Sequence, residues 1–498
     1  MESSVRQLGA FFKPSSVAVV GATKKINKAG HVIFKNFVEN KRRGIFKGEL
    51  FAVNPNEDSI LEYHSYRSVK DVPGELELVV IVVPAKIVPD IVKDAVSKKV
   101  KDIVIISSGF GEVGNHDLEN QVVTIAKKAG IRILGPNCLG VYDTRAGVDM
   151  LFLPETKILT TGDEVIATPR PIPGDIAIVT QSGAFGVAIL DFLTGRQIGI
   201  SKFVSFGNKC DVTETEMLHY LLYDEETKTI LLYVEDIKSG REFIKVAKKV
   251  TRKKPIVALK SGRTEAGARA AASHTGAIAG SDRIYDAVFA QTGILRAKDM
   301  EEFLDAGKAL AMQPPAAGKN VGIITDAGGP GIMAVDESES KGLVVKRFSE
   351  KTIMKFEKLK ETGKLPKFAT NLNPVDITGS GTSEMFECAT EIVFQDPEIN
   401  GVIMLGMHHA PGLQEDFIDR VAKVAAKYDK PIVACDIGET EMALYTRSRF
   451  DKLDIPAYGS PEDAARAMNA LVKYGLYLKK NSVFNEYMHG FLETKPKQ

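Results

Sequence analysis

Three apolar runs, each followed by a glycine-containing turn, constrain the fold of this 498-residue chain more than any other feature. The runs begin at residues 17, 176 and 321, and a helical pattern follows each turn. Uninterrupted runs rich in valine and isoleucine are typical of strands buried on both faces of a parallel sheet. The spacing of the three starts fits three domains of ordinary size. In such sheets, ligands bind at the carboxyl ends of the strands.

Two stretches rich in proline and glycine mark the expected domain boundaries. They cover residues 161–174 and 313–318, ahead of the second and third apolar runs. We therefore expect domains at residues 1–150, 151–313 and 314–498. The predicted fold class is α/β, with three consecutive Rossmann- or flavodoxin-like doubly wound domains whose sheets are mainly parallel.

The charge balance and the cysteine pattern exclude several classes of protein. Lysine and arginine number 65 against 64 aspartates and glutamates, so nothing attracts the chain as a whole to nucleic acid or to an anionic membrane. The first residues carry no apolar signal segment, and no uncharged apolar run is long enough to cross a bilayer. The four cysteines are scattered without a CxxC pair, which is typical of reduced thiols in a cytoplasmic protein.

The first domain resembles a dinucleotide-binding unit in outline but lacks the residues for one. Further strands are expected at 50–53, 78–83, 102–106 and 131–134. No GxGxxG follows Gly21, and Asn54 stands where an NAD site usually places an acidic residue. Lys24, Lys25 and Lys28 follow the first turn and suit a ligand with more phosphate charge, such as coenzyme A. The alternative for these lysines is a solvated loop.

In the second domain, Gln181-Ser182-Gly183 follows an apolar run and begins a helix. The GxSxG pattern of a hydrolase nucleophile is absent, because Thr180 stands where its first glycine belongs. We interpret Ser182 and the N–H groups at the start of the helix that follows it as an anion site, with a plain helix cap as the alternative. Glu235 ends another apolar run, and a carboxylate there is either a solvated residue or a partner for an imidazole.

His274 lies in a segment in which almost every neighbour is alanine, serine, threonine or glycine. Such backbone can approach a ligand closely, and Gly276 and Gly280 argue against a regular helix. We therefore expect an exposed loop that carries one nucleophilic imidazole, with Glu235 as its candidate partner. The alternative is a surface loop with an incidental histidine.

The third domain offers a second loop for an oxyanion. Residues 371–382 are dense in turn and capping residues and include Gly379. The adjacent His408 and His409 would point to opposite faces of a strand, and no further ligand spacing accompanies them, so a loop is favoured over a metal site. We expect no bound metal. No GxxxxGK[ST] motif for ATP is present.

Several of these segments together resemble one known family. Ser273-His274-Thr275-Gly276-Ala277 is similar to a loop whose histidine is transiently phosphorylated, and Tyr233-Val234-Glu235-Asp236-Ile237 to the segment whose glutamate orients it. Gly135-Pro136-Asn137-Cys138-Leu139-Gly140, Gln181-Ser182-Gly183, and Asn373-Pro374-Val375-Asp376 with Thr378-Gly379 resemble further signatures. The chain resembles, over nearly its whole length, the α subunit of an NDP-forming acyl-CoA synthetase. The likeness is greatest to archaeal ADP-forming acetate–CoA ligases, relatives of succinyl-CoA synthetase.

The resemblance implies a function and a set of site residues. Acyl-CoA, ADP and phosphate would give a carboxylic acid, ATP and coenzyme A, reversibly, through an acyl phosphate and a phosphohistidine at His274, with Glu235 also catalytic. The expected phosphate-binding residues are Asn137, Cys138, Ser182, Gly183 and Gly379. The expected coenzyme A contacts are Gly21, Thr23, Lys28, Asn54, Val83, Pro84, Ser107 and Ser108.

The family's nucleotide-binding ATP-grasp module has no counterpart in the three predicted domains. The resemblance therefore implies a separate ATP-grasp β subunit that binds ADP or ATP with Mg²⁺, most simply in an α₂β₂ complex. A small carboxylic acid and coenzyme A are the expected substrates, and the sequence does not identify the acid. Two alternatives remain, an NAD-dependent dehydrogenase and a non-catalytic CoA sensor of the same fold.

Overall fold

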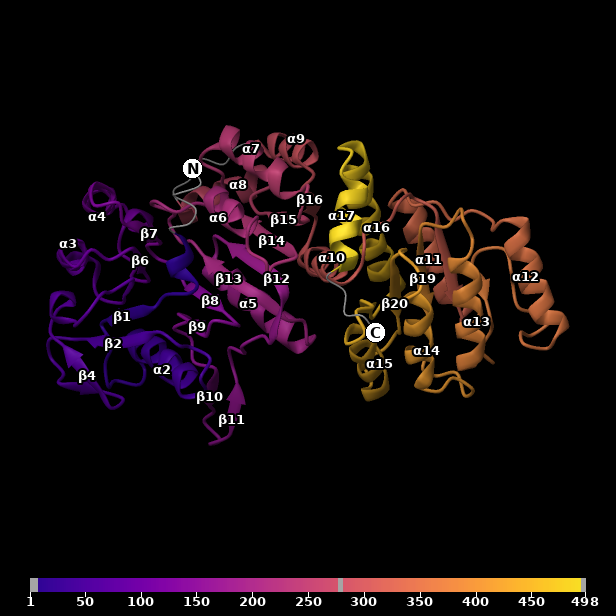
Figure 1. The fold of residues 1–498 in the computed structure, drawn as a ribbon, viewed down its shortest axis with the longest axis horizontal. Helices are drawn as coiled ribbons and strands as arrows, with labels where there is room; N and C mark the ends of the chain where they lie inside the picture. The colour runs from indigo at the N-terminus through magenta and orange to yellow at the C-terminus, as the bar shows by residue number, and fades with distance from the viewer. Residues whose placement is uncertain (1–7, 276–280, 494–498) are drawn as a thin grey trace. The chain divides into compact units, whose positions relative to one another are not determined.

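The computed structural model describes residues 8–275 and 281–493, and the side chains of residues 271–275 are outside this description. The chain divides into two compact units, residues 1–294 and 295–498 (Figure 1). Each unit is built from parallel strands that are buried on both faces, with helices between them.

The first sheet of the N-terminal unit has the strand order β3-β4-β2-β1-β5-β6-β7. Its strands are β1 (Ser16–Val20), β2 (Glu49–Val53), β3 (Ser59–Ile60), β4 (Tyr63–Tyr66), β5 (Leu78–Ile81), β6 (Asp102–Ile105) and β7 (Arg132–Leu134). All neighbours except β3 and β4 are parallel. The connecting helices are α2 (Ala29–Arg42), α3 (Val88–Ser97) and α4 (His116–Lys128). The strands expected at 17–20, 50–53, 78–83, 102–106 and 131–134 are all present, but β5 ends at Ile81, β6 ends at Ile105 and β7 begins at Arg132.

The second sheet of this unit has the order β15-β14-β12-β13-β8-β9 within residues 1–294. Its strands are β8 (Gly140–Asp143), β9 (Val148–Asp149), β12 (Pro173–Thr180), β13 (Ile200–Ser205), β14 (Thr229–Val234) and β15 (Ile256–Lys260). The helices are α5 (Gly183–Gly195), α6 (Glu214–Leu221), α7 (Gly240–Val250), α8 (Glu265–Thr275) and α9 (Asp282–Thr292). Only β8 and β9 run antiparallel to their neighbours.

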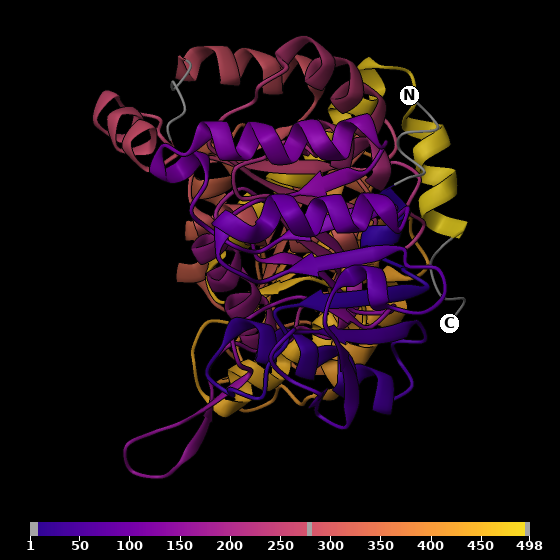
Figure 2. The same cartoon turned by 90° about the vertical axis from the view of Figure 1, so that its left-hand side faces the viewer.

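A two-stranded hairpin of β10 (Thr156–Ile158) and β11 (Glu164–Ile166) extends away from the body of this unit (Figure 2). The two larger sheets share one hydrophobic core, because buried residues such as Val19 and Val104 of the first sheet and Val179 and Leu232 of the second belong to a single cluster. This continuous core packs the two sheets against each other within the N-terminal unit.

The C-terminal unit contains a third parallel sheet with the order β18-β17-β19-β20-β21. Its strands are β17 (Val321–Thr325), β18 (Val375–Asp376), β19 (Gly401–Leu405), β20 (Ile432–Cys435) and β21 (Ala457–Tyr458). The short strand β16 (Leu295–Ala297) precedes them in the chain and is not part of this sheet. The helices are α10 (Met300–Met312), α11 (Gly328–Ser340), α12 (Glu350–Glu361), α13 (Ser383–Phe394), α14 (Asp416–Ala425), α15 (Glu441–Asp451), α16 (Pro461–Lys480) and α17 (Phe484–Glu493).

The predicted fold class of three consecutive doubly wound α/β domains is confirmed. One segment crosses the predicted division, since β8 and β9 fall within residues 1–150 of the predicted first domain but pair with the second sheet. The boundaries at 150 and 313 remain predictions.

Candidate functional site

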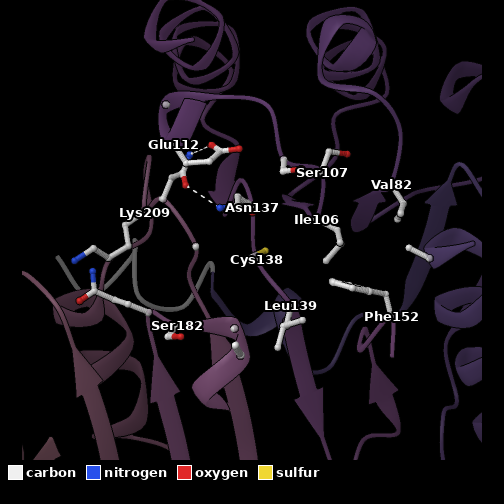
Figure 3. Close-up of a pocket in the computed structure, with 18 of the residues that line it drawn as sticks. Val82, Ile106, Ser107, Glu112, Asn137, Cys138, Leu139, Phe152, Ser182 and Lys209 are labelled. Carbon is white, nitrogen blue, oxygen red and sulfur yellow. Dashed lines mark hydrogen bonds between the residues drawn. The ribbon is translucent and has the colours of Figure 1, made fainter. Parts of the chain in front are cut away.

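One cavity of about 1490 Å³ lies in the N-terminal unit where strands of both sheets end. It is lined by residues of the segments that follow β1, β5, β6 and β7 of the first sheet and β12, β13 and β14 of the second. Parallel strands place their following turns at the same sheet edge, so one core brings together segments that are far apart in the chain. Figure 3 shows Val82, Ile106, Leu139 and Phe152 at one side of this cavity and Ser182 and Lys209 at the other.

Most of the residues predicted to bind coenzyme A line this cavity, namely Gly21, Thr23, Lys28, Val83, Pro84, Ser107 and Ser108. Gly21 has a φ of +95° and lies so close to the carbonyl of Val82 that a side chain would collide with it. Ser107 Oγ accepts a hydrogen bond of 3.0 Å from the N–H of Val83, which ties two of the turns together. The backbone at this edge can therefore come close to a ligand.

A carboxylate already occupies part of the first turn. Thr23 Oγ1 donates to Glu57 Oε1 at 2.5 Å, and the N–H of Lys24 donates to both oxygens of the same carboxylate. Lys28 precedes α2 and borders the cavity. Within this turn, Lys28 is thus the predicted contact whose charge suits a phosphate.

Asn54 is not among the residues that line the cavity. Its Nδ2 donates to the carbonyl oxygen of Ala22 at 2.8 Å, and its Oδ1 accepts from the N–H of Asn56. Asn54 therefore stabilises the first turn by a hydrogen bond from outside the cavity lining.

Four of the five residues predicted to bind phosphate line the same cavity, namely Asn137, Cys138, Ser182 and Gly183. Ser182 is the N-cap of α5, where its Oγ accepts from the N–H of Phe185 at 3.3 Å. The backbone of Asn137 is left-handed, with a φ of 58°. Because a helix N-terminus carries free N–H groups and positive potential, the start of α5 is suited to an anion.

The thiol of Cys138 takes part in a hydrogen bond within the protein. Cys138 Sγ donates to the carbonyl oxygen of Ile105 at 3.3 Å. Burial raises the pKa of this thiol to about 12, so it is neutral at physiological pH. Any contact of Cys138 with an anion would therefore come from its backbone.

Glu235 directly follows β14, lines the cavity and is buried, with 8% of its surface exposed. Its neighbour Asp236 accepts from Lys209 Nζ at 3.0 Å, and Lys209 also contacts Glu214 at 3.0 Å. Although burial by itself would raise the pKa of Asp236, Lys209 and Gln181 hold it below its ordinary value. The floor of the cavity thus carries an ionised carboxylate fixed by a buried lysine.

The expected loop around His274 is corrected for residues 265–275. They form helix α8, whose last residue is Thr275. Five alanines in residues 266–272 favour a helix strongly enough to accommodate Gly267. The side chain of His274 and residues 276–280 lie outside the described part of the chain, so the predicted contact between His274 and Glu235 stays a prediction.

Gly379 belongs to the C-terminal unit, in the turn between β18 and α13. In this turn, Thr378 Oγ1 and Ser380 Oγ lie 2.9 Å apart, and the N–H of Thr378 donates to Asp376 Oδ1. A side chain at Gly379 would meet no atom within 4 Å, so this backbone is open on one side.

Sequence reasoning missed several polar residues that the fold brings into the cavity. Asn208 Nδ2 donates to Glu112 Oε2 at 2.6 Å and to Glu119 Oε2 at 2.8 Å. Gln181 contacts Asp236, and Lys209 supplies the buried charge described above. The sequence carries a signal for two of these residues, because Gln181 is next to Ser182 and Asp236 is next to Glu235. It carries no such signal for the others.

Among the described side chains, no group of three or more histidine, cysteine, aspartate or glutamate residues is arranged to hold a metal ion. Of the helices in residues 8–275 and 281–493, none combines the length and the apolar composition that a bilayer crossing needs.

Three family models match the chain in succession. They are a CoA binding domain over residues 15–144, a succinyl-CoA ligase like flavodoxin domain over 173–310, and a ligase-CoA domain over 321–474. The chain is similar to a Candidatus Korarchaeum cryptofilum acetyl-coenzyme A synthetase 1, solved in complex with phosphate and ADP. The two share 35% identity and superpose with a TM-score of 0.85, covering 95% of this chain and 98% of the other.

Two curated relatives place the chain more narrowly. It is 39% identical to the ADP-forming acetate–CoA ligase of Methanocaldococcus jannaschii, covering 96% of this chain and 65% of that one. It is 38% identical over 490 residues to the α subunit of ADP-forming acetate–CoA ligase I of Pyrococcus furiosus, covering 95% of this chain and 99% of the relative. The chain therefore belongs to the family of α subunits of ADP-forming acetate–CoA ligases.

Proposed function

We propose that the chain is the α subunit of an ADP-forming acyl-CoA synthetase that forms an acyl phosphate and then a phosphohistidine at His274. Family membership makes it part of an acid–CoA ligase of the ADP-forming, acetate type. One observation supports the finer proposal most. Seven of the eight residues expected to bind coenzyme A and four of the five expected to bind phosphate line one cavity, with Glu235 on its wall.

The proposed reaction has three reversible steps. A phosphate oxygen attacks the thioester carbonyl, the C–S bond breaks, and coenzyme A leaves as an acyl phosphate forms. A nitrogen of His274 then attacks phosphorus, and the P–O bond to the acyl group breaks to release the carboxylate. Finally, the β-phosphate of ADP takes the phosphoryl group from the histidine, which gives ATP and restores His274.

The described residues meet the needs of the first two steps. Phosphoryl transfer depends mostly on positioning and on stabilisation of negative charge. The start of α5, with Ser182 and Gly183, and the turn at Asn137 would supply N–H groups for the phosphate. The apolar side chains of Val82, Ile106, Leu139 and Phe152, which line the same cavity, would pack against the bound coenzyme A (Figure 3).

Glu235 would set the protonation state of His274. A histidine attacks phosphorus through an unprotonated nitrogen, so its other nitrogen has to carry the proton. A buried carboxylate that accepts this N–H fixes the tautomer and stabilises the positive charge that develops on the ring. Glu235 is buried at the cavity and suits this role.

We propose that an ATP-grasp β subunit completes the enzyme, binds ADP with Mg²⁺, and joins this chain in an α₂β₂ complex in the cytoplasm. The Pyrococcus relatives are named as α subunits, which implies a partner subunit. This chain covers 65% of the Methanocaldococcus relative, so about a third of that relative lies outside the match, as expected where such a partner is fused.

Labelling of the protein with radioactive phosphate tests the proposal. The purified chain is incubated with acetyl-CoA and labelled phosphate, with His274→Asn as the control. We expect an acid-labile label on the wild type and none on the variant. A wild type that binds coenzyme A but takes no label would instead be a sensor, and label that persists in His274→Asn would move the phosphorylated residue elsewhere.

A further inference from the structure

Gln181 occupies a central position between the two segments proposed to handle phosphate. It lies between the last residue of β12 and Ser182, the N-cap of α5. It lines the cavity, yet only 8% of its surface is exposed. A polar side chain that is buried to this degree needs partners for its carbonyl and its amino group.

The amide of Gln181 binds the end of β14 through three hydrogen bonds. Its Oε1 accepts from the backbone N–H of Glu235 and, at 3.0 Å, from that of Asp236. Its Nε2 donates to Asp236 Oδ1 at 2.6 Å. One side chain therefore holds both residues of the Glu235–Asp236 pair, 54 and 55 positions further along the chain.

The state of Asp236 makes the donor on Gln181 necessary. Lys209 Nζ contacts Asp236 Oδ1 at 3.0 Å, and the pKa of Asp236 is held below its ordinary value despite its burial. An ionised carboxylate only accepts hydrogen bonds. At this position, therefore, an amide matches both neighbours, because it accepts from the two N–H groups and donates to the carboxylate.

From this geometry we infer that Gln181 is a positioning residue, which holds Glu235 in place relative to the phosphate-binding start of α5. Gln181 belongs to the turn that carries Ser182, so its hydrogen bonds fix the spacing between that turn and Glu235. Catalytic geometry is sensitive to such spacing, since a misplacement of about 1 Å can cost about 10²-fold in rate. This inference rests on the proposed function.

The variant Gln181→Glu gives a signature that a merely structural role would not produce. One oxygen of the new carboxylate can still accept from the N–H groups of Glu235 and Asp236. Its second oxygen would face the carboxylate of Asp236, and two ionised carboxylates in contact repel. Protonation of the new side chain turns that oxygen into a donor and restores the lost hydrogen bond.

The rate of histidine labelling is measured for wild type and Gln181→Glu at about pH 8 and at about pH 6. At the lower pH, a carboxyl group whose pKa is raised regains its proton. We expect a loss of about 10²-fold at the higher pH. We expect the ratio of wild-type to variant rates to fall severalfold at the lower pH. The affinity for coenzyme A should stay unchanged, because the first-domain turns are intact.

Two further variants complete the experiment. Gln181→Met keeps the length of the side chain but removes the hydrogen bonds, so its loss should not depend on pH. Gln313→Glu is the matched control, because Gln313 is a buried glutamine of the C-terminal unit that accepts from Ile432 N and donates to the Asp454 carbonyl. It should lower the melting temperature without changing the labelling rate.

The outcomes separate this inference from the proposed function. If the wild type takes no label, the proposed function fails and this inference fails with it. If the wild type is labelled but Gln181→Glu shows no loss, or an equal loss at both pH values, only the inference is overturned. If Gln181→Glu does not fold, a labelling rate of Gln181→Met within a few-fold of wild type overturns it.

Discussion

At the scale of single residues, Glu235 is the carboxylate whose burial matters most for the proposed chemistry. Glu235→Gln keeps the shape of the side chain but removes its charge, so it can no longer stabilise the imidazolium of His274. Loss of the equivalent carboxylate in a serine protease triad costs about 10⁴-fold in rate. We expect a labelling loss of that order, measured by rapid quench of the single turnover.

The exposed Glu242 of α7 provides the matched control for this change. Glu242→Gln makes the same substitution away from the cavity and should keep the wild-type rate. If Glu235→Gln labels within a few-fold of Glu242→Gln, Glu235 is not the partner of His274.

Lys28 is the second residue whose charge can be tested alone. It borders the cavity next to the first turn. In that turn the backbone N–H of Lys24 already donates to the carboxylate of Glu57. A charge-assisted hydrogen bond to a phosphate contributes roughly 1.5–3 kcal/mol, so Lys28→Ala should weaken coenzyme A binding roughly tenfold to a hundredfold. Calorimetry measures this loss, and Lys35→Ala, on the exposed side of the same helix, should bind like wild type.

Asp326 makes the stability of the C-terminal unit depend on pH. Burial, with a smaller contribution from Asp436 and Asp376, raises the pKa of Asp326 to about 7. In the unfolded chain the same carboxyl titrates near about 3.9, so the folded state holds an extra proton between these values. Stability from this group is therefore complete below about pH 4 and is lost as the pH rises through about 7.

Asp326→Asn should remove that dependence. The amide oxygen can still accept from the N–H of Met407, which is the contact Asp326 makes now. At about pH 8 the variant should be more stable by on the order of 2–4 kcal/mol, with little difference near pH 4. Urea unfolding across this range measures it, with exposed Asp336→Asn as the control. Parallel curves for wild type and Asp326→Asn would contradict the prediction.

At the scale of elements, helix α2 packs directly on the turn that follows β1. An added Cβ at Gly30, in the first turn of α2, would overlap with the carbonyl group of Gly21. Because that neighbour is backbone, Gly30→Ala should displace the turn, lower the melting temperature and weaken coenzyme A binding. Thermal unfolding and calorimetry measure both effects.

Gly240→Ala is the control, because a side chain at the first residue of α7 would meet no atom within 4 Å. It should be neutral or slightly stabilising, by up to about 1 kcal/mol, since alanine is the better helix former. Equal behaviour of the two variants would mean that the close approach at Gly30 is not needed.

The strands were predictable from the sequence, whereas one helix was not. Runs such as residues 17–20 and 321–325 are apolar throughout because both faces of those strands are covered. Around His274, glycines and small residues argued for a loop, but alanine propensity extends α8 to Thr275. In this segment the glycines favour a loop while the alanines favour a helix, and the sequence alone does not show which preference prevails.

At the scale of the whole molecule, the proposed partner leads to a prediction about ATP. The chain alone should exchange phosphate into His274 with acyl-CoA present but form no ATP from ADP. Addition of an ATP-grasp β subunit should restore ATP formation, because a phosphohistidine needs an ADP site that is shielded from water. A luciferase assay on each preparation measures this, with His274→Asn plus the β subunit as the negative control. Robust ATP synthesis by the chain alone would reveal a nucleotide site within it.

The sequence by itself determined the three α/β domains and the turns that end their strands, because those signals are local. Apolar runs, turn residues and helix caps depend on neighbours within a few positions. Only the tertiary structure decided that seven such turns share one cavity, that Asn54 braces a turn, and that Gln181 and Lys209 converge on Asp236. The contacts of Asn54, Gln181 and Lys209 join residues 27 to 55 positions apart, and no local pattern encodes them. The turns meet in one cavity because one continuous core holds the two sheets together.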